Sequence, residues 1–92
     1  MVERIESYRF SNRFKIEYNA LSKEIQKAFD KKLALFLEDT THPSLRVKRI
    51  QGTKDRWEGS VTKNYRFTFE FVEKSVLFRN IGTHYILSRT RK

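Results

Sequence analysis

Two side chains in this sequence are of types that could act on a phosphodiester. His84 follows Gly82-Thr83 at the end of the last long predicted strand, and imidazole, with an unperturbed pKa of about 6.5, can accept and donate a proton at cellular pH. Arg66 lies within an alternating strand, and a guanidinium can bind two phosphate oxygens at once. Each also has an ordinary interpretation: a lone histidine is weak evidence for catalysis, and Arg66 could form a salt bridge with an acid such as Glu70.

The positive charge of the chain is concentrated in its second half. Residues 42–92 hold twelve Lys or Arg against four Asp or Glu, a net charge of +8, whereas residues 1–41 hold eight against seven. A basic surface attracts phosphate, so nucleic acid is the first partner to consider. A high net charge that serves only solubility is the alternative. The cations of the basic half include Arg46, Lys48, Lys63 and Arg79.

Composition argues against several classes of site. The chain has no cysteine and only two histidines, so disulfide and thiolate chemistry are excluded and we expect no metal site and no cofactor. It contains no apolar run of about 18 residues and no signal-peptide pattern at its N-terminus. We therefore expect a cytoplasmic protein without a membrane partner. Residues 1–92 are predicted to form one domain with a short charged tail at residues 88–92.

Two amphipathic helices are predicted after a short strand at residues 5–10. Ser11 or Asn12 can cap the first helix and Ser22 the second. Their apolar side chains recur at helical spacing and comprise Phe14, Tyr18, Leu21, Ile25, Ala28, Phe29, Leu33, Phe36 and Leu37. The opposite face of the second helix is predicted to meet water and carries Lys23, Glu24, Lys27, Lys31 and Lys32. This helix should end before Pro43, because a proline disfavours the helical conformation in the residue before it.

After the proline, the apolar period changes from about 3.6 residues to 2, which predicts strands. We expect a strand at residues 45–48, one that begins at Trp57, one at residues 65–72 and a central strand at residues 76–81 that is buried on both sides. Asn64 could supply the left-handed conformation of a tight hairpin. In the clearest strand, one face carries Tyr65, Phe67, Phe69 and Phe71.

The predicted fold is α+β, with an N-terminal strand and a two-helix hairpin packed on one face of a mainly antiparallel sheet of four to five strands. The aromatic side chains should supply the core between the two layers. Trp57 is expected in the core, although an exposed indole could stack on a base, and His42 is expected to cap a helix end. The other face of the sheet would then present Arg46, Lys48, Arg66 and Thr68 together.

The order of these motifs resembles the RelE/ParE superfamily of type II toxins over roughly residues 5–87. The resemblance rests on Phe14 and Leu21, the amphipathic helix, His42-Pro43-Ser44-Leu45-Arg46-Val47-Lys48, Trp57-Glu58, Tyr65-Arg66 and Gly82-Thr83-His84. It implies a small α+β toxin that a cognate antitoxin neutralises. In the RelE-like and YafQ-like branches it implies metal-independent cleavage of mRNA in the ribosomal A site, with the ribosome and mRNA as further partners.

The resemblance also implies roles for individual residues. Arg66 matches the arginine that binds phosphate and stabilises the transition state, and His84 matches the catalytic acid or base of the YafQ-like branch. Lys48 matches a basic catalytic residue in type only. The expected substrate-binding residues are Arg46, Lys63, Arg79 and Tyr85. Two positions depart from the pattern, Ser60 in place of an arginine and Ser88 in place of an aromatic residue, so the second proton-transfer group stays unassigned.

Two other functions remain open at this point. A ParE-like member of the superfamily would inhibit DNA gyrase through protein contacts and would need no acid–base pair. A basic sheet could also belong to a non-catalytic RNA-binding module. The antitoxin is expected on physical grounds too, because a basic groove flanked by amphipathic helices suits an acidic, partly disordered chain that folds on binding.

Overall fold

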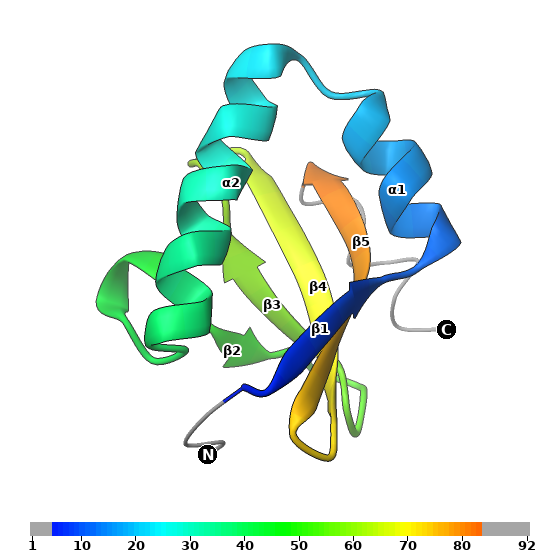
Figure 1. The fold of residues 1–92 in the computed structure, drawn as a ribbon, viewed down its shortest axis with the longest axis vertical. Helices are drawn as coiled ribbons and strands as arrows, with labels where there is room; N and C mark the ends of the chain where they lie inside the picture. The colour runs from blue at the N-terminus through cyan, green and yellow to red at the C-terminus, as the bar shows by residue number, and fades with distance from the viewer. Residues whose placement is uncertain (1–4, 84–92) are drawn as a thin grey trace.

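The computed structural model describes residues 5–83, which form two helices over one face of a five-stranded sheet (Figure 1). In chain order the elements are β1 (Ser7–Phe10), α1 (Asn12–Asn19), α2 (Lys23–Glu38), the 3-10 helix η1 (Pro43–Leu45), β2 (Lys48–Arg49), β3 (Trp57–Ser60), β4 (Tyr65–Val72) and β5 (Ser75–Thr83). The strand order is β1-β5-β4-β3-β2. β1 runs parallel to β5, and the other described pairs are antiparallel. The predicted α+β class is confirmed.

Serine side chains begin both α-helices where the sequence predicts. The hydroxyl oxygens of Ser11 and Ser22 accept hydrogen bonds from the backbone N–H groups of Phe14 and Ile25, at 3.0 and 3.3 Å. These bonds satisfy donors that a helix N-terminus otherwise leaves unpaired. His42 is a capping residue, but it caps the start of η1 through its Nδ1 atom and not the end of the second α-helix, whose C-cap is Asp39. Among the described residues, no helix has the length and apolar character needed to cross a membrane.

Aromatic side chains from both layers form the core. Phe67 and Phe69 of β4 and Phe78 of β5 are fully buried. The ring centroids of Phe36 and Phe69 lie 4.9 Å apart and those of Phe29 and Phe67 5.5 Å apart, in edge-to-face arrangements that the ring quadrupoles favour. The predicted packing of the second helix on the aromatic face of the sheet is therefore confirmed.

The segment after η1 differs from the strand predicted at residues 45–48. Leu45 ends the 3-10 helix and is fully buried, and Arg46 then adopts a left-handed conformation with φ 49° and ψ 45°. The strand β2 is reduced to Lys48–Arg49 at the edge of the sheet. Because the core holds Leu45 and the chain turns at Arg46, pairing with β3 begins only at Lys48.

Two further details of the sheet correct the predictions. Asn64 is not left-handed; Glu73, between β4 and β5, adopts the left-handed conformation instead, with φ 59°. β5 is not buried on both sides but alternates, and a bulge opposite Thr68 and Phe69 leaves Arg79 without a cross-strand partner. A bulge shifts the alternation by one residue. This shift explains the uneven spacing of the buried residues Val76, Phe78 and Ile81.

Candidate functional site

The face of the sheet turned away from the helices carries part of the predicted cation cluster. Cross-strand pairing places Lys48 opposite Glu58, and Glu58 opposite Thr68, so these three side chains project from one face. Arg66 lies two residues before Thr68 in β4 and shares its face. Lys48, Arg66 and Thr68 therefore share a face as predicted, but Thr68 is fully buried and is not presented at the surface. Arg46 lies in the turn after η1, outside the sheet.

The guanidinium of Arg66 is fixed by surrounding groups. Its Nη1 atom donates hydrogen bonds to the backbone carbonyl oxygens of Thr62, Lys63 and Tyr65, at 2.8, 3.1 and 3.1 Å. Its Nε atom lies 3.8 Å from Oε1 of Glu58, which is almost fully buried. Within residues 5–83, Nη2 donates no hydrogen bond, and 25% of the side chain is exposed. The guanidinium thus ties the β3–β4 connection to the start of β4, and among the described residues Nη2 keeps its donors for a ligand.

Arg79 and Glu70 form a separate cluster. Nη1 of Arg79 lies 2.9 Å from Oε2 of Glu70, and Nη1 of Arg56 lies 3.4 Å from the same oxygen. The ordinary interpretation of Arg66, a salt bridge with an acid, therefore holds with Glu58 as the partner and not with Glu70, which pairs with two other arginines. Arg79 keeps 37% of its side chain exposed.

A polar hollow of about 470 Å³ opens between α2, the turn after η1 and the β3–β4 connection. Its lining, which we name the basic hollow, consists of Lys32, Arg46, Ser60, Val61, Thr62, Lys63 and Arg66. Three residues predicted for the site, Arg46, Lys63 and Arg66, come together here, but Lys48 does not line it. No acidic side chain of the described residues does so either.

Lys32 and Glu58 were missed by sequence reasoning. Lys32 was placed among the water-facing lysines, yet it lines the basic hollow and its Nζ atom donates a hydrogen bond to the carbonyl oxygen of Ser44 at 3.0 Å. Its spacing of three residues from Phe29 and four from Phe36, both buried, is the signal that puts it at the border of the packed face. The alternation of side chains along the strand that begins at Trp57 could have placed Glu58 on the same face as Lys48 and Arg66.

His84 and Tyr85 lie outside the described residues. The structure defines the strand that precedes them in the sequence: β5 ends at Thr83, and Gly82 is the cross-strand partner of Arg66. Among residues 5–83, no three His, Asp or Glu side chains form a group that could hold a metal ion.

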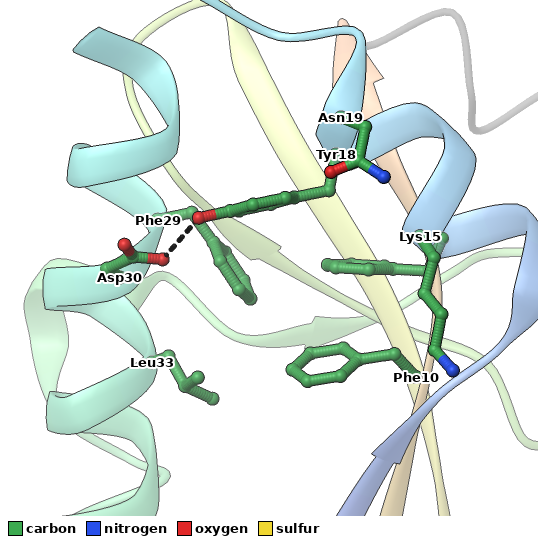
Figure 2. A pocket seen from close by; sticks show the side chains of 8 residues that line it. Phe10, Lys15, Tyr18, Asn19, Phe29, Asp30 and Leu33 are labelled. Atoms are coloured by element: carbon green, nitrogen blue, oxygen red, sulfur yellow. Dashed lines mark hydrogen bonds between the residues drawn. The ribbon is translucent and has the colours of Figure 1, made fainter. Parts of the chain in front are cut away.

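A second hollow, of about 400 Å³, lies between α1, α2 and β1 (Figure 2). We name it the apolar groove; it is lined by Phe10, Phe14, Lys15, Tyr18, Asn19, Phe29, Asp30 and Leu33. Tyr18 reaches across from α1 and donates a hydrogen bond to Oδ1 of Asp30 on α2, at 2.8 Å (Figure 2). Burial, this hydrogen bond and the charge of Asp30 raise the pKa of Tyr18 above its usual value. Sequence reasoning assigned Phe14, Tyr18, Phe29 and Leu33 to the packed face of the helices, and it predicted a basic groove flanked by the helices, whereas this groove is mainly apolar.

Solved structures of toxin–antitoxin complexes share this architecture. A chain of the E. coli DinJ-YafQ toxin-antitoxin complex matches with a TM-score of 0.73 and 16% identity, over 87% of this chain and 93% of that chain. A chain of the RelB-RelE antitoxin-toxin complex from Methanococcus jannaschii matches with a TM-score of 0.71 and 15% identity, over 90% and 98%. The chain has the RelE/YafQ fold.

The RelE/YafQ fold extends to a third neighbour, a YoeB/ParE toxin from Agrobacterium tumefaciens, with a TM-score of 0.71 and 9% identity over 86% of this chain and 99% of that chain. No family model matches the sequence, and no curated protein gives a significant match. The predicted resemblance to RelE-like toxins is thus confirmed at the level of the fold. Roles for individual residues have to be argued from the site itself.

Proposed function

We propose that this protein is the toxin of a type II toxin–antitoxin system and cleaves mRNA on the ribosome without a metal ion. The observation that carries the proposal is Arg66. Its guanidinium is held in place with Nη2 available, beside a hollow lined by four cations and no acid of the described residues, and opposite Gly82 on the strand that precedes His84. Such a site favours a ligand that gains negative charge as it reacts.

The reaction requires little covalent chemistry from the protein. The 2′-hydroxyl of RNA gives up its proton to a general base, the second proton-transfer group that stays unassigned. Its oxygen attacks the adjacent phosphorus, a bond from O2′ to phosphorus forms, and the bond from phosphorus to the 5′-oxygen breaks. Arg66 stabilises the charge that develops on the phosphoryl oxygens. His84 acts as general acid and protonates the departing 5′-oxygen. RNA supplies its own nucleophile, so no metal-bound hydroxide is needed.

Other cations would hold the RNA backbone around the scissile bond. Lys48 projects from the same face as Arg66, where its ammonium adds to the stabilisation of the transition state. Arg46 and Lys63 line the basic hollow, and the side chain of Arg79 is partly exposed. We assign these three, together with Tyr85, to substrate binding.

The ribosome would contribute orientation. A positioned general acid typically contributes about 10²–10⁴-fold to a rate, which is less than fast cleavage requires. Holding the 2′-hydroxyl in line with the scissile bond can supply much of the remainder. We therefore expect cleavage of mRNA bound to ribosomes and little cleavage of free RNA.

The direct test incubates the purified protein with mRNA-programmed ribosomes and maps the new 5′ ends. His84→Ala should slow cleavage by about 10²–10⁴-fold while ribosome binding persists. His42→Ala is the matched control, because it removes the other histidine, which caps η1, and should leave cleavage near the wild-type rate. Unchanged cleavage by His84→Ala would remove that residue from the mechanism.

A ParE-like activity is the second candidate, and the YoeB/ParE neighbour favours it. Inhibition of DNA gyrase through protein contacts would not require the pair Arg66 and His84. Growth arrest that survives the double variant Arg66→Ala/His84→Ala, together with a DNA damage response, would support the gyrase function. RNA binding without any cleavage would instead leave a non-catalytic RNA-binding module.

The second part of the proposal is a cognate antitoxin that binds the apolar groove. Two of the similar structures are complexes of a toxin with its antitoxin, and the groove exposes aromatic and aliphatic side chains between two amphipathic helices. The chain carries a formal charge of +9, which favours an acidic partner. We expect a partly disordered acidic chain that inserts apolar side chains into the groove and orders on binding.

A further inference from the structure

The basic hollow collects cations from segments that are distant in the sequence. Lys32 comes from α2, Arg46 from the turn after η1, and Lys63 and Arg66 from the β3–β4 connection and the start of β4. The two acids on the neighbouring sheet face are already paired: Glu58 lies near Arg66, and Glu70 binds Arg56 and Arg79. Glu58 thus partly offsets the charge of Arg66, and among the described residues the charges of Lys32, Arg46 and Lys63 are left for a ligand to neutralise.

The side chains of the hollow keep donors for that ligand. An ammonium has three N–H donors, and Lys32 donates one of them to the carbonyl oxygen of Ser44. The carbonyl oxygens of Thr62 and Lys63, which would repel an anion, accept hydrogen bonds from Nη1 of Arg66 instead. The volume of about 470 Å³ lies within the range of about 300–1,000 Å³ that is common for ligand sites.

Arg46 reaches the hollow from a strained backbone. Its left-handed conformation, with φ 49° and ψ 45°, is unfavourable by about 1–2 kcal/mol for a residue with a Cβ atom. Glycine would adopt the same conformation without this cost. An arginine at this position therefore points to a role for its side chain.

We propose that the basic hollow is a second phosphate subsite, which binds the RNA backbone phosphate next to the scissile one. Arg66 connects the proposed cleavage site and the subsite. It projects from the sheet face that carries Lys48, and it also lines the basic hollow. A strand of RNA that crosses the sheet face at Arg66 would enter the hollow with its neighbouring phosphate. This inference deepens the proposed function and rests on it for the identity of the ligand.

An acidic peptide is the competing occupant, but the lining favours phosphate. Apart from Val61, the residues of the hollow are cationic or hydroxyl-bearing, and Val61 itself is buried in the core. A peptide that orders on binding needs apolar contacts to offset its ordering. The apolar groove between the helices offers such contacts.

The test measures binding of a short RNA oligonucleotide that carries 2′-O-methyl groups and so cannot be cleaved, over a range of salt concentrations. Lys32→Ala should weaken binding roughly fivefold and reduce the salt slope by about 0.7, the value for one phosphate contact on a single strand. Lys31→Ala is the matched control, since it removes the same charge from an exposed position one residue away on α2.

A second variant separates binding from folding. Arg46→Gly should leave the thermal midpoint unchanged or raise it, because it relieves the left-handed strain, and should still weaken RNA binding roughly fivefold. The subsite would be overturned if Lys32→Ala and Arg46→Gly bound RNA with the same affinity as Lys31→Ala. A loss of antitoxin binding with RNA binding intact would also overturn it, because that result would assign the hollow to an acidic peptide. Because the probe cannot be cleaved, the two proposals are tested separately: RNA binding through the hollow without ribosomal cleavage would contradict the endonuclease and leave the hollow as a site for an RNA phosphate with no scissile neighbour.

Discussion

At the scale of single residues, strand phase predicted which way Arg66 points but not what holds it. The alternation of β4 puts Arg66 and Phe67 on opposite faces, and this much follows from the sequence. Two of the three carbonyl oxygens that accept from Nη1 belong to the β3–β4 connection, whose conformation no local pattern specifies, and the third belongs to Tyr65 at the start of β4. The acid near Nε is Glu58 on the neighbouring strand and not Glu70, because pairing between strands depends on their register.

Gly59 gives a residue-scale prediction about stability. A Cβ atom built on Gly59 would lie 2.3 Å from Cζ of Phe67, whose ring is fully buried. Gly59→Ala should lower the free energy of unfolding by about 1–3 kcal/mol, as overpacking of a core does, in urea denaturation followed by circular dichroism. Adding Phe67→Leu should recover part of the loss, since it removes the ring atoms that clash. If Gly59→Ala unfolded at the same urea concentration as the wild type, the ring of Phe67 would not be confined by its surroundings.

At the scale of the elements, capping residues and apolar periodicity predicted the two α-helices. Contacts between segments distant in the sequence determine the turn at Arg46 and the bulge at Arg79. Serine caps and apolar periodicity located both α-helices. The turn at Arg46 depends on Leu45 being anchored in the core, and the bulge at Arg79 on the register of two strands. Glu17 of α1 accepts a hydrogen bond from the backbone N–H of Ile81 in β5 at 3.0 Å. This contact joins residues far apart in the sequence, so no local sequence pattern predicts it.

The apolar groove gives a prediction at this scale, because it exists only where α1, α2 and β1 meet. Leu33→Asp places a charge in its lining and should weaken binding of the cognate antitoxin on the order of tenfold or more in calorimetry. Ile16→Asp is the control, since Ile16 on α1 is 64% exposed and does not line the groove. The thermal midpoint of each variant checks folding. Equal affinities for the two variants would place the antitoxin elsewhere.

At the scale of the whole molecule, the charge distribution predicts nucleic acid as the class of partner, and only the fold locates the candidate site. The excess of Lys and Arg after residue 41 is visible in the sequence. The basic hollow, however, combines Lys32 with residues 46 and 60–66, and it forms because α2 packs across the sheet beside the β3–β4 connection (Figure 1). Lys32 could not be assigned from the sequence for this reason.

The central claim is that Arg66 stabilises the transition state of mRNA cleavage on the ribosome. Its most direct test is the single-turnover rate of cleavage on programmed ribosomes for Arg66→Lys, with Arg9→Lys, an exposed arginine of β1, as the matched control. A lysine keeps the charge but loses the planar set of donors. We predict a rate lower by about 10²–10³-fold for Arg66→Lys, ribosome affinity close to wild type, and an unchanged rate for Arg9→Lys. Wild-type cleavage by Arg66→Lys, or equal losses of rate and ribosome affinity, would contradict this account.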